Sequence, residues 1–210
     1  IMKADFEMLL EALKRENKHG LRAICVLSGV YGIRISEIAG MKIKNGIVEI
    51  TTLKQNEKTM NEEPHTRIVQ PLNLPNLPKL GEEIIADLES RKITFPDPIK
   101  RALAKSNDDD GYKLVGERFG KLINRFWFWK ELKTKYSNLV PYAFRHSYAW
   151  RGSMETVPAV PYRVLADLLG HDLDTHLKYY GKWSNDQENK KCIEEANKNI
   201  LDKYALASTK

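Results

Sequence analysis

The segment that decides the fold of this chain reads Ala166-Asp-Leu-Leu-Gly-His171-Asp-Leu-Asp-Thr-His176-Leu-Lys-Tyr179-Tyr180-Gly-Lys-Trp183. A short apolar run ends in Leu-Gly-His, a mostly polar stretch of helical length follows, and two adjacent tyrosines come next. A tyrosine has a solution pKa near ~10, so it becomes a nucleophile only where neighbours stabilise its anion or take its proton. Within this segment His171 is such a neighbour.

Two other stretches belong to the same pattern. They read Gly32-Ile-Arg34-Ile-Ser-Glu37-Ile and Pro141-Tyr142-Ala-Phe-Arg145-His146-Ser-Tyr-Ala. Arginine donates two parallel hydrogen bonds from a planar group that stays charged at neutral pH, which makes it suited to phosphate. The three stretches together place two arginines before a histidine and a tyrosine.

Composition sets the outer limits. The 210 residues suffice for one compact domain, and Lys and Arg (34) exceed Asp and Glu (28). This basic balance suits a polyanionic partner, although a modest excess also occurs in proteins that bind nothing acidic. Cys25 and Cys192 form neither a metal-binding spacing nor a disulfide framework, so we expect a reducing, cytoplasmic setting. We expect no secretory signal and no membrane-spanning segment.

The first third of the chain predicts helices. Asp5 is expected to cap a helix that ends near Gly20, with apolar residues at helical spacing, namely Phe6, Leu9, Leu10 and Leu13. Residues 21–30 predict a buried helix, which Gly32 ends. Ser36 is expected to cap a short helix beside Arg34. A surface arginine is the plain interpretation of Arg34, whereas rigid packing at a helix junction would aim it at a phosphate.

Two strands follow, over residues 47–52 and 66–72, because both stretches are rich in β-branched residues and alternate in polarity. The polar loop between them, residues 54–64, is too long for a tight turn. It contains Lys54 and Lys58, which are solvated in the plain interpretation and contact phosphate in the alternative one.

The remaining elements are predicted helices at residues 82–88, 115–132, 145–152, 162–169 and 186–206. Pro96-Asp-Pro98 and residues 107–111 are expected to be connections. The aromatic stripe of the helix at residues 115–132 is expected to be core rather than a base-stacking surface. Gly170 is expected to end the helix before His171. The fold class is therefore mainly α with a small antiparallel β-sheet (α+β).

The ordered series of Arg34, Glu37, a hairpin lysine, Arg145-His146, Leu-Gly-His171 and Tyr180 resembles the catalytic domain of tyrosine recombinases, the phage-integrase family. The resemblance covers nearly all 210 residues. It implies a mainly helical fold and a reaction in which tyrosine attacks a DNA phosphodiester. The products are a 3′-phosphotyrosyl link and a 5′-hydroxyl, and neither a metal nor ATP nor another cofactor is required.

The resemblance also assigns roles. It implies that Arg34 and Arg145 stabilise charge on the phosphate, that Lys54 (or Lys58) protonates the leaving oxygen, and that His171 hydrogen-bonds the phosphate. Glu37 matches an acidic position that orients the site. The nucleophile lies nine residues after the Leu-Gly-His histidine, which selects Tyr180 over Tyr179, and Trp183 is expected to pack behind it.

One departure from the family pattern concerns the proton acceptor. The family has His-x-x-Arg where this chain has Tyr142-x-x-Arg145. A tyrosine can donate a hydrogen bond to phosphate but is a poor base near neutral pH. His146 is adjacent, but one residue turns a helix by about 100°, so we expect His146 to serve packing. The base is left unassigned.

On this resemblance residues 1–210 form a catalytic domain, and the family's N-terminal core-binding domain is absent from the chain. The implied partner is double-stranded DNA, bound weakly and in a salt-sensitive way. The expected assembly is a homo-tetramer on paired sites and a monomer or weak oligomer without DNA, with the helix at residues 186–206 passed to a neighbouring protomer. A bacterial or phage origin and a cytoplasmic location are implied.

Three other interpretations are weighed against this one. A type IB topoisomerase would use the same residues as a monomer, without a second site. A catalytically inactive DNA-binding or regulatory domain is suggested by Tyr142. A helical scaffold protein would leave the ordered series to coincidence.

Overall fold

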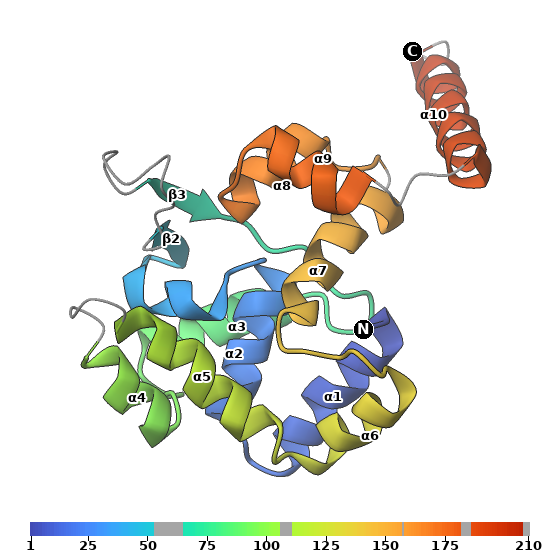
Figure 1. Cartoon of the computed structure of the whole chain (residues 1–210). Helices are drawn as coiled ribbons and strands as arrows, with labels where there is room; N and C mark the ends of the chain where they lie inside the picture. Colours follow the sequence, from blue (N-terminus) through green and yellow to red (C-terminus); the bar gives the residue numbers. More distant parts are fainter. Residues whose placement is uncertain (53–64, 106–110, 157, 182–185, 208–210) are drawn as a thin grey trace. The chain divides into compact units, whose positions relative to one another are not determined.

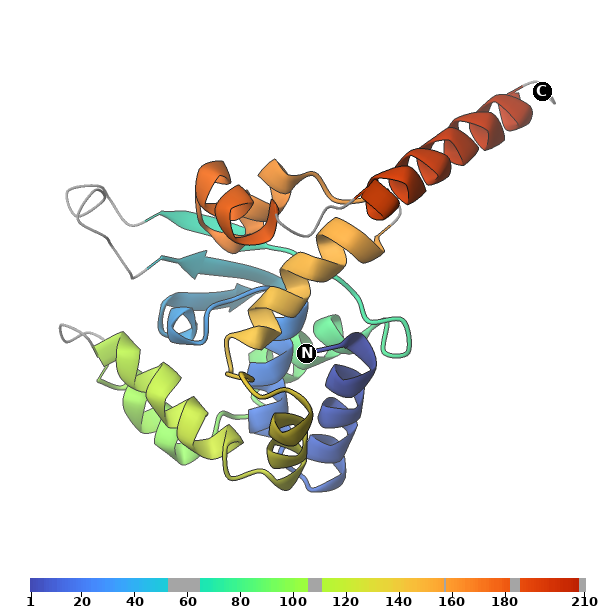
Figure 2. The ribbon, with the colours of Figure 1, turned by 45° about the vertical axis from the view of Figure 1, so that its right-hand side comes forward.

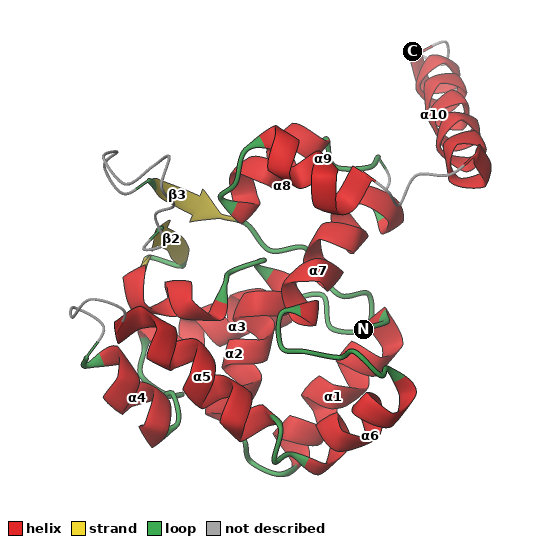
Figure 3. Ribbon diagram, viewed as in Figure 1, coloured by secondary structure: helices red, strands yellow, loops and turns green. Residues whose placement is uncertain are grey.

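The computed structural model describes residues 1–52, 65–105, 111–156, 158–181 and 186–207. Helices dominate, with one three-stranded antiparallel sheet, so the predicted fold class is confirmed (Figures 1 and 3). The chain divides into two compact units. The first contains residues 1–148 and 168–170, and the second contains residues 149–167 and 171–210.

The core of the first unit is built on α2 (His19–Val30), in which residues 21–30 are all buried, as predicted. Against it pack α1 (Lys3–Arg15) and α3 (Leu80–Glu89). Aromatic rings join distant segments of this core: the Phe144 ring lies 5.4 Å from that of Phe6 and 5.1 Å from that of Trp129.

The sheet of the first unit has the order β1-β2-β3 (Figure 2). The predicted strands are confirmed as β2 (Ile47–Thr51) and β3 (Thr66–Val69), which pair with Val48 opposite Val69. The sequence analysis missed β1 (Met41–Lys44), which pairs with β2 through an Asn45-Gly46 turn with positive φ at both residues. Asn-Gly is a strong hairpin signal, so this strand was predictable.

Two predicted helix ends are wrong. Asp5 lies inside α1, which begins at Lys3, because its buried carboxylate accepts hydrogen bonds from Lys135 Nζ and the Tyr136 hydroxyl instead of capping the helix. Gly20 lies in the first turn of α2 rather than at the end of α1. An added Cβ at Gly20 would stand 2.3 Å from the Thr94 carbonyl oxygen, so the glycine permits close packing.

The predicted single helix at residues 115–132 is two helices, α5 (Gly111–Ile123) and α6 (Trp127–Lys135). The chain turns at Asn124, whose side-chain oxygen accepts hydrogen bonds from Trp129 Nε1 and Lys133 Nζ, both at 3.1 Å. Local polar contacts of asparagine compete in this way with continued helix. The turn leaves Trp127 48 % exposed, so the aromatic stripe is only partly core.

The expected connection at Pro96-Asp-Pro98 is also wrong, because α4 (Asp97–Leu103) begins there. Proline in the first helical turn removes only a donor that has no partner within the helix. α7 (Ala143–Trp150) follows later in the chain, and its residues up to Tyr148 belong to the first unit.

The second unit begins at Ala149, with the last two residues of α7, and continues into a short π-helix, η2 (Arg151–Glu155). α8 (Tyr162–Leu169) matches its predicted range, and Gly170, at φ +66°, ends it. α9 (Leu173–Tyr180) is capped by Asp172, which accepts a hydrogen bond from the Thr175 N–H at 2.6 Å. α10 (Asp186–Ala207) confirms the predicted terminal helix.

Candidate functional site: an arginine cluster and a histidine–tyrosine cluster

Arg34 and Glu37 are positioned by the turn that follows α2. Gly32 has φ +69°, a conformation that favours glycine, and it directs the chain into the 3₁₀ helix η1 (Ile35–Gly40). Ser36, the expected cap, does not fill that role. The Glu37 carboxylate instead accepts a hydrogen bond from the Arg34 N–H at 2.9 Å, and Arg34 Nη1 donates to it at 2.6 Å.

Glu37 is the centre of what we call the arginine cluster, which consists of Arg34, Glu37, Arg67 and Arg145. The carboxylate of Glu37 is 2 % exposed and lies 2.8 Å from Arg67 Nη2 and 3.8 Å from Arg145 Nη1. Burial alone would raise the pKa of Glu37, but the charges of the three arginines outweigh it and lower that pKa. Glu37 therefore stays ionised at neutral pH.

Backbone carbonyls hold the three arginines in place. Arg145 donates to the carbonyls of Gly32 and Leu169, and Arg67 Nε donates to the Leu168 carbonyl at 2.9 Å. Arg34 reaches the Gly170 carbonyl at 3.4 Å. The Leu-Leu-Gly end of α8 thus supplies one acceptor to each arginine, which is a reason for that motif to precede His171 in the chain.

The arginines differ in their access to solvent. The Arg34 side chain is 23 % exposed, whereas those of Arg67 and Arg145 are 4 % and 0 % exposed. The four side chains together carry two net positive charges in a poorly hydrated place, which favours a bound anion. Arg34 is the most solvent-accessible arginine of the cluster, and Arg145 is fully buried.

Tyr142 and His146 lie beside this cluster. The pKa of the Arg34 guanidinium is raised. Burial, the largest single influence, lowers this pKa, but Glu37 and, to a smaller extent, the interacting Tyr142 side chain raise it. The His146 ring stands 4.7 Å from the Tyr142 ring in an edge-to-face arrangement. Burial, and secondly the charge of Arg145, lower the pKa of His146, so it is neutral at neutral pH.

The second unit holds the histidine–tyrosine cluster, which consists of His171, His176, Tyr180 and Tyr162. His171 Nε2 and His176 Nδ1 share a hydrogen bond of 3.0 Å. The Tyr180 ring lies 4.7 Å from the His176 ring and 6.0 Å from the His171 ring. Residues 176 and 180 are one helical turn apart on α9, so they share a face of the helix.

The two adjacent tyrosines have different surroundings. Tyr180 is 2 % exposed, and Tyr179 is 60 % exposed. Solvent access alone favours Tyr179 as a reacting residue, and the histidine contacts favour Tyr180. Lys54, Lys58 and Trp183, which the sequence analysis singled out, lie outside the described residues.

Sequence reasoning missed three members of these clusters, namely Arg67, His176 and Tyr162. Arg67 occupies an inward position of β3, on the same face as Val69, and an arginine in that register is a signal for a buried partner. His176 stands four residues before Tyr180, which is a signal for contact on a helix.

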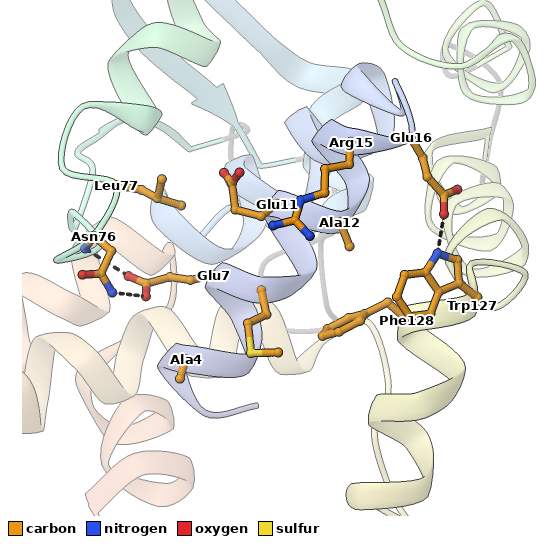
Figure 4. A pocket seen from close by; sticks show the side chains of 11 residues that line it. Ala4, Glu7, Glu11, Ala12, Arg15, Glu16, Asn76, Leu77, Trp127 and Phe128 are labelled. Atoms are coloured by element: carbon orange, nitrogen blue, oxygen red, sulfur yellow. Dashed lines mark hydrogen bonds between the residues drawn. The ribbon is translucent and has the colours of Figure 1, made fainter.

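A separate pocket lies over α1 and α6 in the first unit (Figure 4). Its apolar lining includes Met8, Trp127 and Phe128. Glu7 accepts a hydrogen bond from the Asn76 side chain, and Glu16 accepts one from Trp127 Nε1. Its three glutamates, which include Glu11, oppose the approach of a polyanion.

Within the described residues, no group of three His, Cys, Asp or Glu side chains could hold a metal ion. In the same part of the chain, no helix has both the length and the apolar character needed to cross a membrane.

Comparisons with known proteins give one informative match. No family model and no curated protein matches the sequence. Among solved structures, the crystal structure of XerA recombinase matches with a TM-score of 0.53 and 17% sequence identity. The match covers 93% of this chain and 64% of that one, so this chain spans slightly less than two thirds of the recombinase. At this identity the comparison shows a shared fold.

Proposed function

We propose that this chain is the catalytic part of a site-specific DNA recombinase that cleaves and rejoins DNA through a 3′-phosphotyrosyl intermediate. Tyr180 is the nucleophile, and Arg34, Arg145 and His171 act on the phosphate. Lys54 or Lys58 protonates the leaving 5′-oxygen. Residues 1–210 act as one catalytic domain on double-stranded DNA, without a metal or another cofactor.

One observation supports this proposal above the others. Arg34 and Arg145, far apart in the sequence, converge on one buried glutamate in a fold shared with a recombinase. A structural role alone would be served by one arginine for one carboxylate. Surplus positive charge, with Arg34 partly exposed, is what a site for a phosphodiester requires.

The chemistry follows from these groups. Attack by the tyrosine oxygen gives a five-coordinate phosphorus whose non-bridging oxygens gain negative charge. A preorganised donor to such oxygens contributes roughly 3 kcal/mol, about two powers of ten in rate. Arg34 supplies this donation directly. Arg145 supplies charge and holds the Gly32 turn and the end of α8.

Tyr142 and His146 have supporting roles in this proposal. Tyr142 beside Arg34 can donate a hydrogen bond to the same phosphate. His146 packs on the Tyr142 ring and fixes its position. Neither is asked to remove the proton from Tyr180.

Covalent trapping tests the proposal. Nicked duplexes from the DNA that flanks the gene, in which the cleaved strand loses a short 5′-hydroxyl end, are incubated with the protein and EDTA. We expect a denaturation-resistant adduct that mass spectrometry places on Tyr180 and that Tyr180→Phe abolishes. Tyr179→Phe is the matched control and should retain the adduct.

The other outcomes separate the alternatives. An adduct on Tyr179 would move the nucleophile by one residue within the same chemistry. Relaxation of supercoiled plasmid by a monomer, independent of any paired site, would indicate a type IB topoisomerase. DNA binding without any adduct would indicate an inactive DNA-binding domain and would overturn the proposal.

A further inference from the structure

His176 is the centre of the histidine–tyrosine cluster. Its side chain is completely buried, and its ring lies near three others, namely Tyr180 at 4.7 Å, His171 at 5.2 Å and Tyr162 of α8 at 5.5 Å. A histidine that only filled space here would be replaceable by any ring. His176 also shares a hydrogen bond with His171, so its protonation is tied to a partner.

That hydrogen bond determines what the other nitrogen of His176 can do. If Nδ1 of His176 carries the proton and donates to His171 Nε2, then Nε2 of His176 has a lone pair and can accept a proton. The opposite tautomer leaves His176 Nε2 as a donor. The 3.0 Å bond therefore gives His171 the means to set His176 as a base.

The proposed cleavage needs such a base. The hydroxyl of Tyr180 must lose its proton as it attacks, and Tyr142, which lies beside the Arg34 guanidinium, is a poor acceptor near neutral pH. His176 contacts the ring of Tyr180 from one helical turn away on α9.

We propose that His176, held in the Nδ1–H tautomer by its hydrogen bond to His171, is the proton acceptor for Tyr180. This inference rests on the proposed function. In cleavage, the bond between the Tyr180 oxygen and phosphorus forms, the bond between phosphorus and the 5′-oxygen breaks, and the tyrosine proton passes to His176. The leaving 5′-oxygen takes its proton from Lys54 or Lys58, as proposed above. In rejoining, the 5′-hydroxyl attacks and returns that proton to the lysine, and the tyrosine proton returns from His176 to the departing Tyr180 oxygen.

The first test is the pH dependence of the covalent-trapping rate, measured on the nicked duplexes described above. Within the part of the chain that the structure describes, the rings of His171, Tyr180 and Tyr162 face His176, and all three residues can titrate. We expect the wild-type rate to rise with pH through the range of a histidine, near ~6.5, and then level off. His176→Gln should be roughly 100-fold slower at neutral pH, and its rate should keep rising toward the tyrosine range near ~10.

Controls separate this role from packing and from leaving-group protonation. His176→Phe, which keeps a ring, should be as slow as His176→Gln, whereas the exposed His19→Gln should match the wild type. A substrate with sulfur in place of the 5′-oxygen needs no proton on its leaving group, so it should not rescue His176→Gln. Rescue by sulfur, or wild-type rates in His176→Gln while Tyr180→Phe is inactive, would overturn the inference and leave the proposed function intact.

A measurement without DNA tests the tautomer itself. Long-range ¹H–¹⁵N NMR of the full chain, assigned with the His171→Gln and His176→Gln variants, should show His176 protonated at Nδ1 and unprotonated at Nε2 above pH 7. Protonation at Nε2 would overturn the inference even where Tyr180 forms the adduct. No adduct in the wild type would instead refute the proposed function, and the inference with it.

Discussion

At the scale of single residues, the arginine cluster depends on one carboxylate. Glu37 is the acceptor for Arg34 and Arg67, and its carboxylate lies 3.8 Å from Arg145 Nη1. Removing one partner from a buried ionic network leaves the others uncompensated, which costs more than the pair contributes when intact. A glutamate that takes no part in bond making is therefore as important for this site as the arginines it holds.

Glu37→Gln should lower the free energy of unfolding by about 3 kcal/mol at pH 7, because three arginines lose their shared counter-charge. The lowered pKa of Glu37 adds a pH signature. Above ~4.3, the value expected for the unfolded chain, its stabilisation is complete, and it is lost as pH falls through the folded pKa. Urea unfolding between pH 3 and 7 should therefore show a weaker pH dependence for the variant.

The matched control for this prediction is Glu49→Gln. Glu49 pairs with Lys42 at 4.0 Å, and both side chains are well exposed. Such a surface pair contributes roughly 0–1 kcal/mol. Equal losses in the two variants would contradict a special role for Glu37.

Arg34→Gln should slow covalent trapping roughly 100-fold while DNA affinity changes little, because the lost donation belongs to the transition state. The exposed Arg15→Gln serves as its control. Trapping rates at saturating protein and filter-binding affinities separate the two effects. A parallel loss of affinity and rate would mean that Arg34 only binds DNA.

At the scale of elements, the periodicity of apolar residues predicted those helices and strands that form by burying one apolar face or run. The apolar run of α2, the paired strands β2 and β3, and the helices α8 and α10 follow from local pattern. Three of the wrong predictions involve contacts between residues distant in sequence or polar side chains that act locally. Asp5 binds Lys135, Gly20 packs against Thr94, and Asn124 ends α5 through Trp129 and Lys133.

The candidate site divides in the same way. Arg34, Glu37, Arg145, His171 and Tyr180 were identifiable because their order in the chain carries the resemblance. Arg67 was missed because only the register of β3 turns it inward. His176 was missed because its importance depends on one hydrogen bond, to His171, that no spacing rule requires.

Gly170 gives a prediction at this scale. It has φ +66°, and an added Cβ would stand 2.5 Å from Arg67 Nη1, so Gly170→Ala should both strain the turn and displace a buried arginine. Gly46→Ala shares the positive φ, at +75°, but its Cβ would meet nothing within 4 Å. Thermal unfolding should show a loss of roughly 1 kcal/mol at Gly46 and at least twice that at Gly170. Equal losses would mean that the Arg67 approach is unimportant.

At the scale of the whole molecule, the proposed reaction draws on both compact units. The first unit supplies the arginine cluster, and the second supplies the histidine–tyrosine cluster. The net charge of +6 fits the proposed DNA partner, because it attracts a polyanion in a way that salt weakens and that carries no sequence specificity.

For the last helix, the sequence analysis predicts exchange with a neighbouring protomer on paired DNA sites. Ile193, Ile200 and Leu201 of α10 are 61 %, 51 % and 69 % exposed, and their spacing places them on one stripe. An exposed apolar stripe of this kind is suited to a neighbouring protomer. Replacing all three with Gln should leave the unfolding free energy within about 0.5 kcal/mol, because none is buried in the single chain. It should abolish cooperative assembly on two-site DNA in gel-shift and sedimentation measurements. Lys198→Gln, which leaves the stripe intact, should retain assembly, and loss of stability in the triple variant would place the stripe against its own chain instead.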